Sequence, residues 1–303
     1  MIQAYIFTAS FDVGFIESTL PPLLRMCMTG QANISVIVDA QKPEGVLSKN
    51  ISTHTLDTLL ESLKKLQSTV PFEIILSKEK DDEAKILTKK HFGRTYKESK
   101  CFRGYPTLGS INQFHSTKLP YVLHLDCDMI FYEAPGFSWI KEGIKILEEN
   151  EDILCVLPRG GPPAQNGFLN QGTTSYEIDK KRGLYLFKNF TSRHYLIHRE
   201  RFLSLLPMKP LWLSWREPLK SRLFGNGKML CWESIVENAL KKSLMWRSDL
   251  MTDQAWSLHP GYRSAEFYHL LPQILDSINR NEFPEEQRGH FDLRLSDWKH
   301  FLN

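Results

Sequence analysis

The sequence predicts an α/β protein built on one doubly wound, mostly parallel sheet. Three apolar runs, residues 2–10, 34–40 and 72–76, have the length and the β-branched content of buried strands. Before the third run, residues 55–66 place five leucines on one stripe of a helix. Strands that alternate with helices are typical of a parallel sheet. At 303 residues the chain has room for one large α/β domain or for two modest ones.

The segments that connect these strands are less uniform. Residues 15–28 carry apolar side chains at helical spacing, although two adjacent prolines are expected to begin or kink a helix there. Residues 85–103 contain seven basic side chains and a single acid. We interpret this run as a solvated helix face or, alternatively, as a place from which Lys100 or Arg103 reaches a phosphate.

The stretch at residues 121–132, YVLHLDCDMIFY, organises the rest of the chain. A short apolar run is followed by Asp126 and Asp128, as expected for a buried strand with two carboxylates at its end. Open α/β sheets bind their ligands at the carboxyl ends of strands. Two residues apart on an extended chain, the carboxylates would point the same way and could share a cation or a phosphate-bound metal. A strand that simply ends in a solvated acidic turn is the alternative.

After the acidic strand the pattern continues with a helix around residues 140–147 and a strand at residues 153–158. A loop dense in glycine and proline then begins at Arg159, and such a loop marks a boundary or a mobile active-site loop. The remaining sequence is less regular and richer in aromatic residues. We therefore expect one domain with two halves, residues 1–158 and residues 159–303.

The composition excludes several classes of protein. Lys and Arg number 38 against 35 Asp and Glu, a balance that offers no case for nucleic-acid binding. The hydrophobic content of 42% argues against disorder. Five scattered cysteines, never spaced as CxxC, suggest neither a disulfide framework nor a zinc site and favour a reducing compartment. The N-terminus lacks the pattern of a signal peptide, and no apolar run approaches the length of ~18 residues that is needed to span a bilayer. We therefore expect a soluble, cytoplasmic protein.

Strands and helices that lead to an Asp-X-Asp at the end of a central strand resemble glycosyltransferases of the GT-A fold, and most closely the inverting, family 2-like enzymes. The resemblance extends across most of the chain as a pattern. It implies a Rossmann-like, nucleotide-sugar-binding domain with a divalent cation, Mn²⁺ or Mg²⁺, on the donor diphosphate. Asp126 would then face the nucleotide and Asp128 the metal, which neutralises the charge that grows on the leaving group. Asp39 matches the place of an acid near the base or the ribose; a strand-end cap is the alternative.

The same resemblance implies an acidic catalytic base near the start of a helix in the second half. The segment LFGNGKMLCWES offers Glu233, whose carboxylate would take the proton from the attacking acceptor hydroxyl. The usual Glu-Asp pair is replaced here by Glu233 and Ser234, and Glu237 on the same helix face is a competitor. An acid that only stabilises the positive end of the helix is the simpler interpretation.

Some related transferases supply a histidine to the metal a few tens of residues after the base. His259, in SLHPGYRS, is similarly placed, and a packing role for this turn histidine is the alternative. Arg263 would then be close enough to contact a donor phosphate. Arg193 and His194, on a strand-like segment, could touch the donor sugar or the acceptor.

The predicted reaction is transfer of a hexose from a nucleotide sugar, UDP-linked, to a hydroxyl acceptor with inversion. Residues 1–158 would bind the donor, and residues 159–303 would bind a glycan, a lipid-linked sugar, a protein or a small molecule. The basic residues 85–103 could touch a membrane surface, although the sequence shows no amphipathic anchor. One alternative is a haloacid-dehalogenase-type phosphatase, which normally carries its Asp-X-Asp on the first strand. The other is a catalytically inactive sugar-nucleotide-binding protein.

Overall fold

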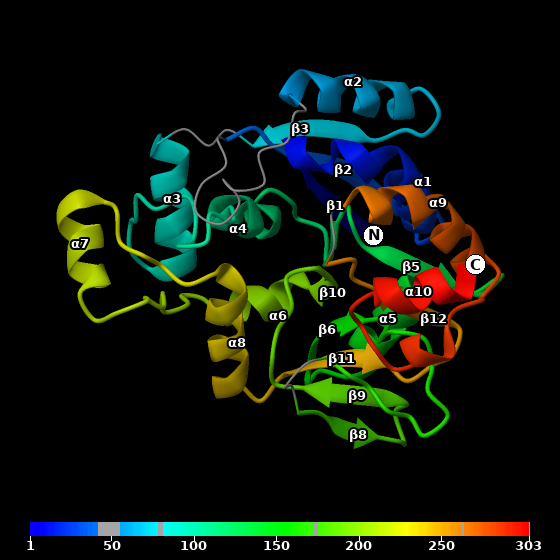
Figure 1. Cartoon of the computed structure of the whole chain (residues 1–303). Coiled ribbons are helices and arrows are strands. Elements are labelled where there is room, and N and C mark those ends of the chain that lie inside the picture. The colour runs from blue at the N-terminus through cyan, green and yellow to red at the C-terminus, as the bar shows by residue number, and fades with distance from the viewer. Residues whose placement is uncertain (42–54, 78–80, 172–174, 262–263, 303) are drawn as a thin grey trace.

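The computed structural model describes residues 1–41, 55–77, 81–171, 175–261 and 264–302. Two sheets form its centre (Figure 1). The strands of the large sheet are β1 (Ile2–Ala9), β2 (Ala32–Asp39), β3 (Glu73–Ser77), β4 (Tyr121–Asp126), β6 (Ile153–Leu157), β8 (Glu177–Asp179), β9 (Leu184–Phe187), β10 (His194–His198) and β11 (Trp246–Leu250). The small sheet consists of β5 (Ile130–Glu133), β7 (Arg159–Gly160) and β12 (Ala255–Leu258).

The large sheet has the strand order β3-β2-β1-β4-β10-β6-β11-β9-β8. Parallel pairs join β1 to β2, β1 to β4, β2 to β3, and β6 to β11. Antiparallel pairs join β10 to β4 and to β6, β9 to β11, and β8 to β9. The prediction of an α/β protein with a central, mostly parallel sheet is therefore confirmed. Because β6 lies between β10 and β11, the two predicted halves of the chain share one sheet.

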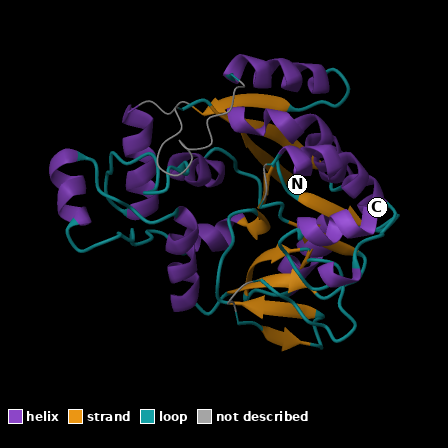
Figure 2. Ribbon diagram, viewed as in Figure 1, coloured by secondary structure: helices purple, strands orange, loops and turns teal. Residues whose placement is uncertain are grey.

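Helices cover both faces of this sheet (Figure 2). The helices of the described chain are α1 (Val13–Thr29), α2 (Leu56–Gln67), α3 (Asp81–Phe92), α4 (Thr107–His115), α5 (Trp139–Glu149), α6 (Arg199–Ser204), α7 (Glu217–Phe224), α8 (Trp232–Lys242), α9 (Ala265–Asn279) and α10 (Leu295–Leu302), of which α7 lies away from the sheet. Within the described ranges, none of these helices combines the length and the apolar character needed to cross a membrane.

Alternation of side chains along the strands divides the interior into two cores. On β1, Ala4 and Ile6 pack with α1, α5 and α9, whereas Tyr5 packs on the other face with α4 and α8. On β4, Leu123 joins the first core and Val122 the second. Strands buried on both faces read as continuous apolar runs, which is why the sequence pattern located them.

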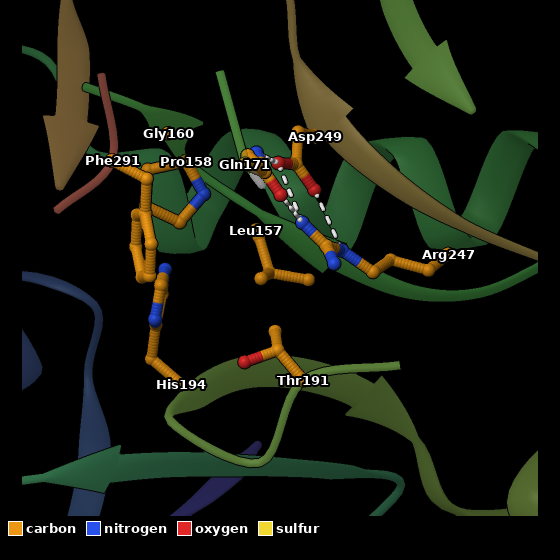
Figure 3. A pocket seen from close by; sticks show the side chains of 9 residues that line it. All are labelled: Leu157, Pro158, Gly160, Gln171, Thr191, His194, Arg247, Asp249 and Phe291. Atoms are coloured by element: carbon orange, nitrogen blue, oxygen red, sulfur yellow. Dashed lines mark hydrogen bonds and ion pairs between the residues drawn. The ribbon is translucent and has the colours of Figure 1, made fainter. Parts of the chain in front are cut away.

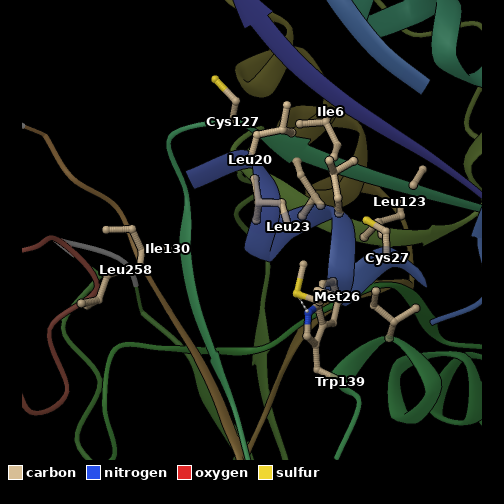
Figure 4. Close-up of a cluster of buried hydrophobic side chains, with 14 of the residues drawn as sticks. Ile6, Leu20, Leu23, Met26, Cys27, Leu123, Cys127, Ile130, Trp139 and Leu258 are labelled. Atoms are coloured by element: carbon tan, nitrogen blue, oxygen red, sulfur yellow. Dashed lines mark hydrogen bonds between the residues drawn. The ribbon is translucent and has the colours of Figure 1, made fainter. Parts of the chain in front are cut away.

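The prolines of α1 do not begin a helix, because the helix runs from Val13 to Thr29 with Pro21 and Pro22 inside it. Each proline removes one backbone donor from the helical ladder. The buried Leu20 and Leu23 lie against the sheet beside Ile6 in the first core, as Figure 4 shows. We attribute the continuity of α1 to this packing, which offsets the lost hydrogen bonds.

Candidate active site

Two of the predicted acids lie at the same edge of the sheet. Asp39 is the last residue of β2 and Asp126 the last residue of β4, on either side of β1. Their register partners on β1 are Ala9 and Phe7, so both carboxylates emerge where the parallel strands end. Neighbouring strands are about 4.8 Å apart, which places β2 and β4 about 10 Å from each other. This is the edge at which α/β sheets bind ligands.

The Asp-X-Asp itself does not have the extended geometry expected from the sequence. The strand β4 ends at Asp126, and Cys127 and Asp128 form a turn in which the Met129 N–H donates to the Asp126 carbonyl at 3.1 Å. The side chain of Asp126 is partly exposed, whereas Asp128 is buried. The period-two alternation of a strand therefore stops between the two carboxylates, and they occupy different environments.

Arg193 lies among these acids. It immediately precedes β10, which pairs antiparallel with β4, and its carbonyl accepts a hydrogen bond of 2.8 Å from the Asp126 N–H. Its Nη1 is 3.5 Å from Asp126 Oδ2. Burial alone would lower the pKa of Arg193, but the carboxylates of Asp126, Asp128 and Glu233 outweigh it and hold the pKa raised. One guanidinium is therefore the electrostatic centre on which three predicted site residues converge.

Glu233 and its competitor Glu237 have different neighbours. Glu233 lies in the first turn of α8, and its Oε2 accepts from Ser192, at 2.9 Å from the hydroxyl and 3.3 Å from the N–H. Ser192 directly precedes Arg193 in the chain. Glu237 instead forms an ion pair with Lys241 one turn further along α8. Of the two acids, Glu233 is the one held against the segment that carries Arg193.

His259 follows β12 and lies beside Asp292. Its Nδ1 is 3.0 Å from Asp292 Oδ1, and its ring stacks on Phe291 with the ring centres 6.0 Å apart. The hydrogen bond to His259 and the nearby Arg193 lower the pKa of Asp292 against the opposing effect of its burial. A histidine whose Nδ1–H donates to a carboxylate presents Nε2 as an acceptor, which is the usual arrangement of a metal-ligating imidazole.

A divalent cation fits this site only in part. In the portion of the chain that the structure describes, no three His, Cys, Asp or Glu side chains are grouped closely enough to hold a metal ion by themselves. Hard cations can take one or two carboxylates and complete their shell with phosphate oxygens and water. The sequence predicts Asp128 and His259 as protein ligands, with a diphosphate to supply further oxygens; in the structure Asp128 lies near Arg193, and His259 contacts Asp292. Arg263 falls outside the described residues.

Asp39 and the basic segment meet on the other side of β1. Burial raises the pKa of Asp39, while the Gln41 N–H, 2.9 Å from its Oδ1, and the nearby Lys100 act in the opposite direction. Lys100 is buried and Arg103 is exposed. The guanidinium of Arg103 lies over the ring of Phe102, 5.4 Å from its centre. Of the two cations proposed to reach a phosphate, Lys100 acts on Asp39, and Arg103 acts on Cys231, which lies two residues before Glu233.

A cavity of about 300 Å³ lies over the strands β1, β2 and β3. Its walls combine apolar and polar side chains, among them Phe7 and Gln113. Phe7 is the register partner of Asp126, and Gln113 is 3.1 Å from His124, whose other ring nitrogen is 3.3 Å from Asp126 Oδ1. The lining residues are Tyr5, Phe7, Ile37, Ile75, Leu76, Ser77, Glu83, Gly109, Asn112, Gln113 and Ser116. The volume and the lining suit a small aromatic ligand group.

A second cavity, near His194, is of a different kind (Figure 3). Its volume of about 20 Å³ admits about one water molecule. Beside it, Arg247 donates to both carboxylate oxygens of Asp249 at 2.9 and 2.8 Å and to Gln171 at 2.7 Å. Gln171 in turn donates to Asp249 at 2.7 Å. This fully bonded buried ion pair has no room for a substrate, and we regard it as structural.

Two residues have a larger part in the site than the sequence predicted. Arg193 was predicted only as a possible contact to the sugar or acceptor, and Asp292 was not considered. Both reach the site through contacts between segments distant in sequence, β4 with β10 and His259 with residues 290–293. Neither carries a local motif that indicates this role.

No family model and no curated sequence matches the chain. Among solved structures, UDP-glucose pyrophosphorylase complexed with UDP-glucose is 10% identical, with a TM-score of 0.46 over 93% of this chain and 98% of that chain. TarS 1-349 of S. aureus is 10% identical, with a TM-score of 0.45 over 91% of this chain and 64% of that chain. GalNAc-T7 with UDP, GalNAc and Mn²⁺ is 12% identical, with a TM-score of 0.46 over 88% of this chain and 44% of that chain.

The chain covers less than two thirds of TarS 1-349 and of GalNAc-T7. At these identities and TM-scores the likenesses concern the fold alone. We therefore base the function on the side chains of the site.

Proposed function

We propose that this protein is a GT-A-like glycosyltransferase that moves a hexose from a UDP-linked donor to a hydroxyl acceptor with inversion. The observation that carries the proposal is the convergence of Asp126, Asp128 and Glu233 on Arg193 at the carboxyl edge of the sheet. The Arg193 guanidinium at that edge supports recognition of a diphosphate, and the nearby Glu233 carboxylate supports the presence of a general base.

The donor would be held by the first half of the chain. The cavity over β1, β2 and β3 has space for the nucleobase, and Asp39 and Asp126, at the ends of the strands on either side of β1, would offer carboxylates to the ribose hydroxyls. Arg193 would hold the diphosphate beyond Asp126 with charge-assisted hydrogen bonds. Mn²⁺ or Mg²⁺, bound through Asp128 and His259, would neutralise charge on the leaving group.

Glu233 would act on the acceptor side, which the second half of the chain supplies. Ser192 donates two hydrogen bonds to Glu233 Oε2 and orients the carboxylate. From that position the carboxylate would take the proton of the acceptor hydroxyl as its oxygen attacks the anomeric carbon opposite the diphosphate. Glu237, already paired with Lys241, is the weaker candidate for the base.

A panel of nucleotide sugars tests the donor half of the proposal. We expect UDP-sugars to raise the melting temperature in the presence of Mn²⁺, because a ligand that binds only the folded state stabilises it. Asp128→Asn should abolish the Mn²⁺-dependent part of the shift and leave the melting temperature without ligand nearly unchanged. Equal Mn²⁺ dependence in Asp128→Asn would remove Asp128 from the metal site.

Single-turnover transfer with a stabilising donor tests the base. Glu233→Gln should lower the rate by about 10²–10⁴-fold with little change in donor affinity, while Glu237→Gln stays near the wild-type rate. The reverse result would assign the base to Glu237. Donor binding without turnover would indicate an inactive sugar-nucleotide-binding protein. Phosphate release from a phosphomonoester without nucleotide would indicate the phosphatase.

A further inference from the structure

Helix α7 has its polarity reversed relative to a helix that packs on a protein core. The side chains that it buries are Glu217 and Ser221, one helical turn apart. The opposite face carries Leu219 and Leu223, which are also one turn apart and are exposed. A surface helix normally buries its leucines and exposes its acids. The helix α7 does contain polar residues, but it turns two of them inward and presents leucines on its outward face.

The reversal is held in place by hydrogen bonds to Glu217. Its Oε1 accepts from Lys220 at 2.9 Å, and its Oε2 accepts from the Lys228 N–H at 2.9 Å. These contacts lower the pKa of Glu217, chiefly through Lys220. Gly225, with φ of 68°, ends the helix in the left-handed region, where a residue without Cβ is favoured. The bond from the Lys228 N–H comes from outside the helix and therefore ties Glu217, and with it the polar face of α7, inward.

The apolar face extends beyond the helix. Several large apolar side chains are exposed within residues 213–224, which hold a third of the large exposed apolar residues found in the described part of the chain. They are Leu213 at 51%, Trp215 at 81%, Leu219 at 57%, Leu223 at 61% and Phe224 at 70%. Five large apolar side chains exposed within twelve residues indicate a surface that meets another apolar phase.

Basic side chains border this face. Residues 209–228 contain five cations and one acid, Glu217, which is buried. The exposed cations are Lys209, Arg216, Lys220, Arg222 and Lys228. Lys97, from the basic segment predicted at residues 85–103, lies against Gly225, since a Cβ added there would be 2.5 Å from its Cδ. The rim of the apolar face is therefore positively charged.

We propose that this face, residues 209–228, seats the protein on an anionic lipid surface. Leucine, tryptophan and phenylalanine would enter the boundary between headgroups and acyl chains, and the lysines and arginines would remain among the anionic headgroups. The helix α7 lies at the periphery of the molecule, where a bilayer could reach its exposed side chains (Figure 1). The anchor that the sequence did not reveal is thus supplied by the tertiary structure. The proposal is independent of the reaction that the protein performs.

Co-sedimentation of the full chain with vesicles tests the proposal. We expect the protein to pellet with vesicles of phosphatidylcholine and phosphatidylglycerol and to stay in solution with phosphatidylcholine alone. The double variant Leu219→Ser/Leu223→Ser should lose this binding. Its matched control is Leu244→Ser, which changes an apolar side chain that is 92% exposed outside the face. Because all three leucines are exposed, the variants should keep the wild-type circular dichroism spectrum and melting temperature.

The contribution of charge is measured in the same assay. Arg222→Gln should weaken binding to anionic vesicles by about fivefold, the effect of removing one cation near such a surface. Lys181→Gln, an exposed site in the turn between β8 and β9, should leave the affinity unchanged. Vesicle binding should also shift the tryptophan emission of the wild type to the blue, and Trp215→Phe should remove most of that shift.

Three results would overturn the proposal. The wild type could fail to pellet with anionic vesicles, or Leu244→Ser could lose binding as fully as the double variant. The wild type could also fail to bind vesicles and instead form a dimer in sedimentation velocity without lipid, which Leu219→Ser/Leu223→Ser converts to a monomer. That last result would assign the face to contacts between copies of the chain.

Discussion

Arg193 is the side chain whose removal best separates a role in binding from a role in folding. Its ion pair with Asp126 has a single contact of 3.5 Å, and the two side chains are 34% and 29% exposed. Such a pair contributes only about 0.2–1 kcal/mol to stability. We therefore expect Arg193→Gln to lower the melting temperature by no more than about 2–4 °C.

Binding of a diphosphate should respond much more strongly. A hydrogen bond to a charged group contributes about 1.5–3 kcal/mol, which corresponds to about 10–100-fold in affinity. The dissociation constant of UDP, measured by titration calorimetry, should rise by that factor in Arg193→Gln. Carboxylates that Arg193 no longer neutralises would add to the loss by repelling the diphosphate.

Arg182→Gln is the matched control. Arg182 contacts Asp152 at 2.8 Å and Asp179 at 2.7 Å, at the far end of the sheet next to β8. Its loss should lower the melting temperature at least as much as Arg193→Gln while UDP affinity stays unchanged. Unchanged UDP affinity in Arg193→Gln would refute the assignment of Arg193 to the diphosphate.

Two further predictions concern titratable groups outside the proposed chemistry. Burial raises the pKa of Glu133 from 4.5 to about 7 against the opposing hydrogen bond from the Trp139 N–H, so the folded chain binds this proton more tightly than the unfolded chain does. The free energy of unfolding should therefore fall by roughly 3 kcal/mol as the pH rises from 4.5 to about 7. Urea titrations should show that Glu133→Gln removes this fall. An unchanged slope would contradict the raised pKa. Second, Cys101 and Cys231 are free thiols whose Sγ atoms are 3.0 Å apart, and the bond from Cys231 lowers the pKa of Cys101. Diamide accepts two hydrogens as a disulfide forms, so treatment should remove two of the five thiols that are titrated after unfolding. Cys101→Ser should prevent this loss. Five remaining thiols in the treated wild type would show that Cys101 and Cys231 do not form a disulfide.

Local pattern in the sequence was enough to predict the strands and the edge at which the acids gather. Apolar runs at residues 2–10, 34–40 and 72–76 correspond to β1, β2 and β3. The strands β1 and β2 are largely buried and therefore read as continuous apolar runs, whereas the edge strand β3 is only partly buried. Asp39 and Asp126 are the last residues of β2 and β4, and parallel strands bring such ends to the same edge of the sheet. These features depend on neighbours in the chain, which a single sequence displays.

Contacts between distant segments decided the rest. Arg193 meets Asp126 because β10 pairs antiparallel with β4, and Glu233 differs from Glu237 because only Glu233 meets Ser192. The helix α1 passes through its two prolines because packing on the sheet offsets the bonds they remove. On α7 the leucines face outward because Glu217 is tied inward, a choice that the hydrophobic pattern alone would have reversed. Periodicity shows which residues share a face, but only the fold shows which way that face points.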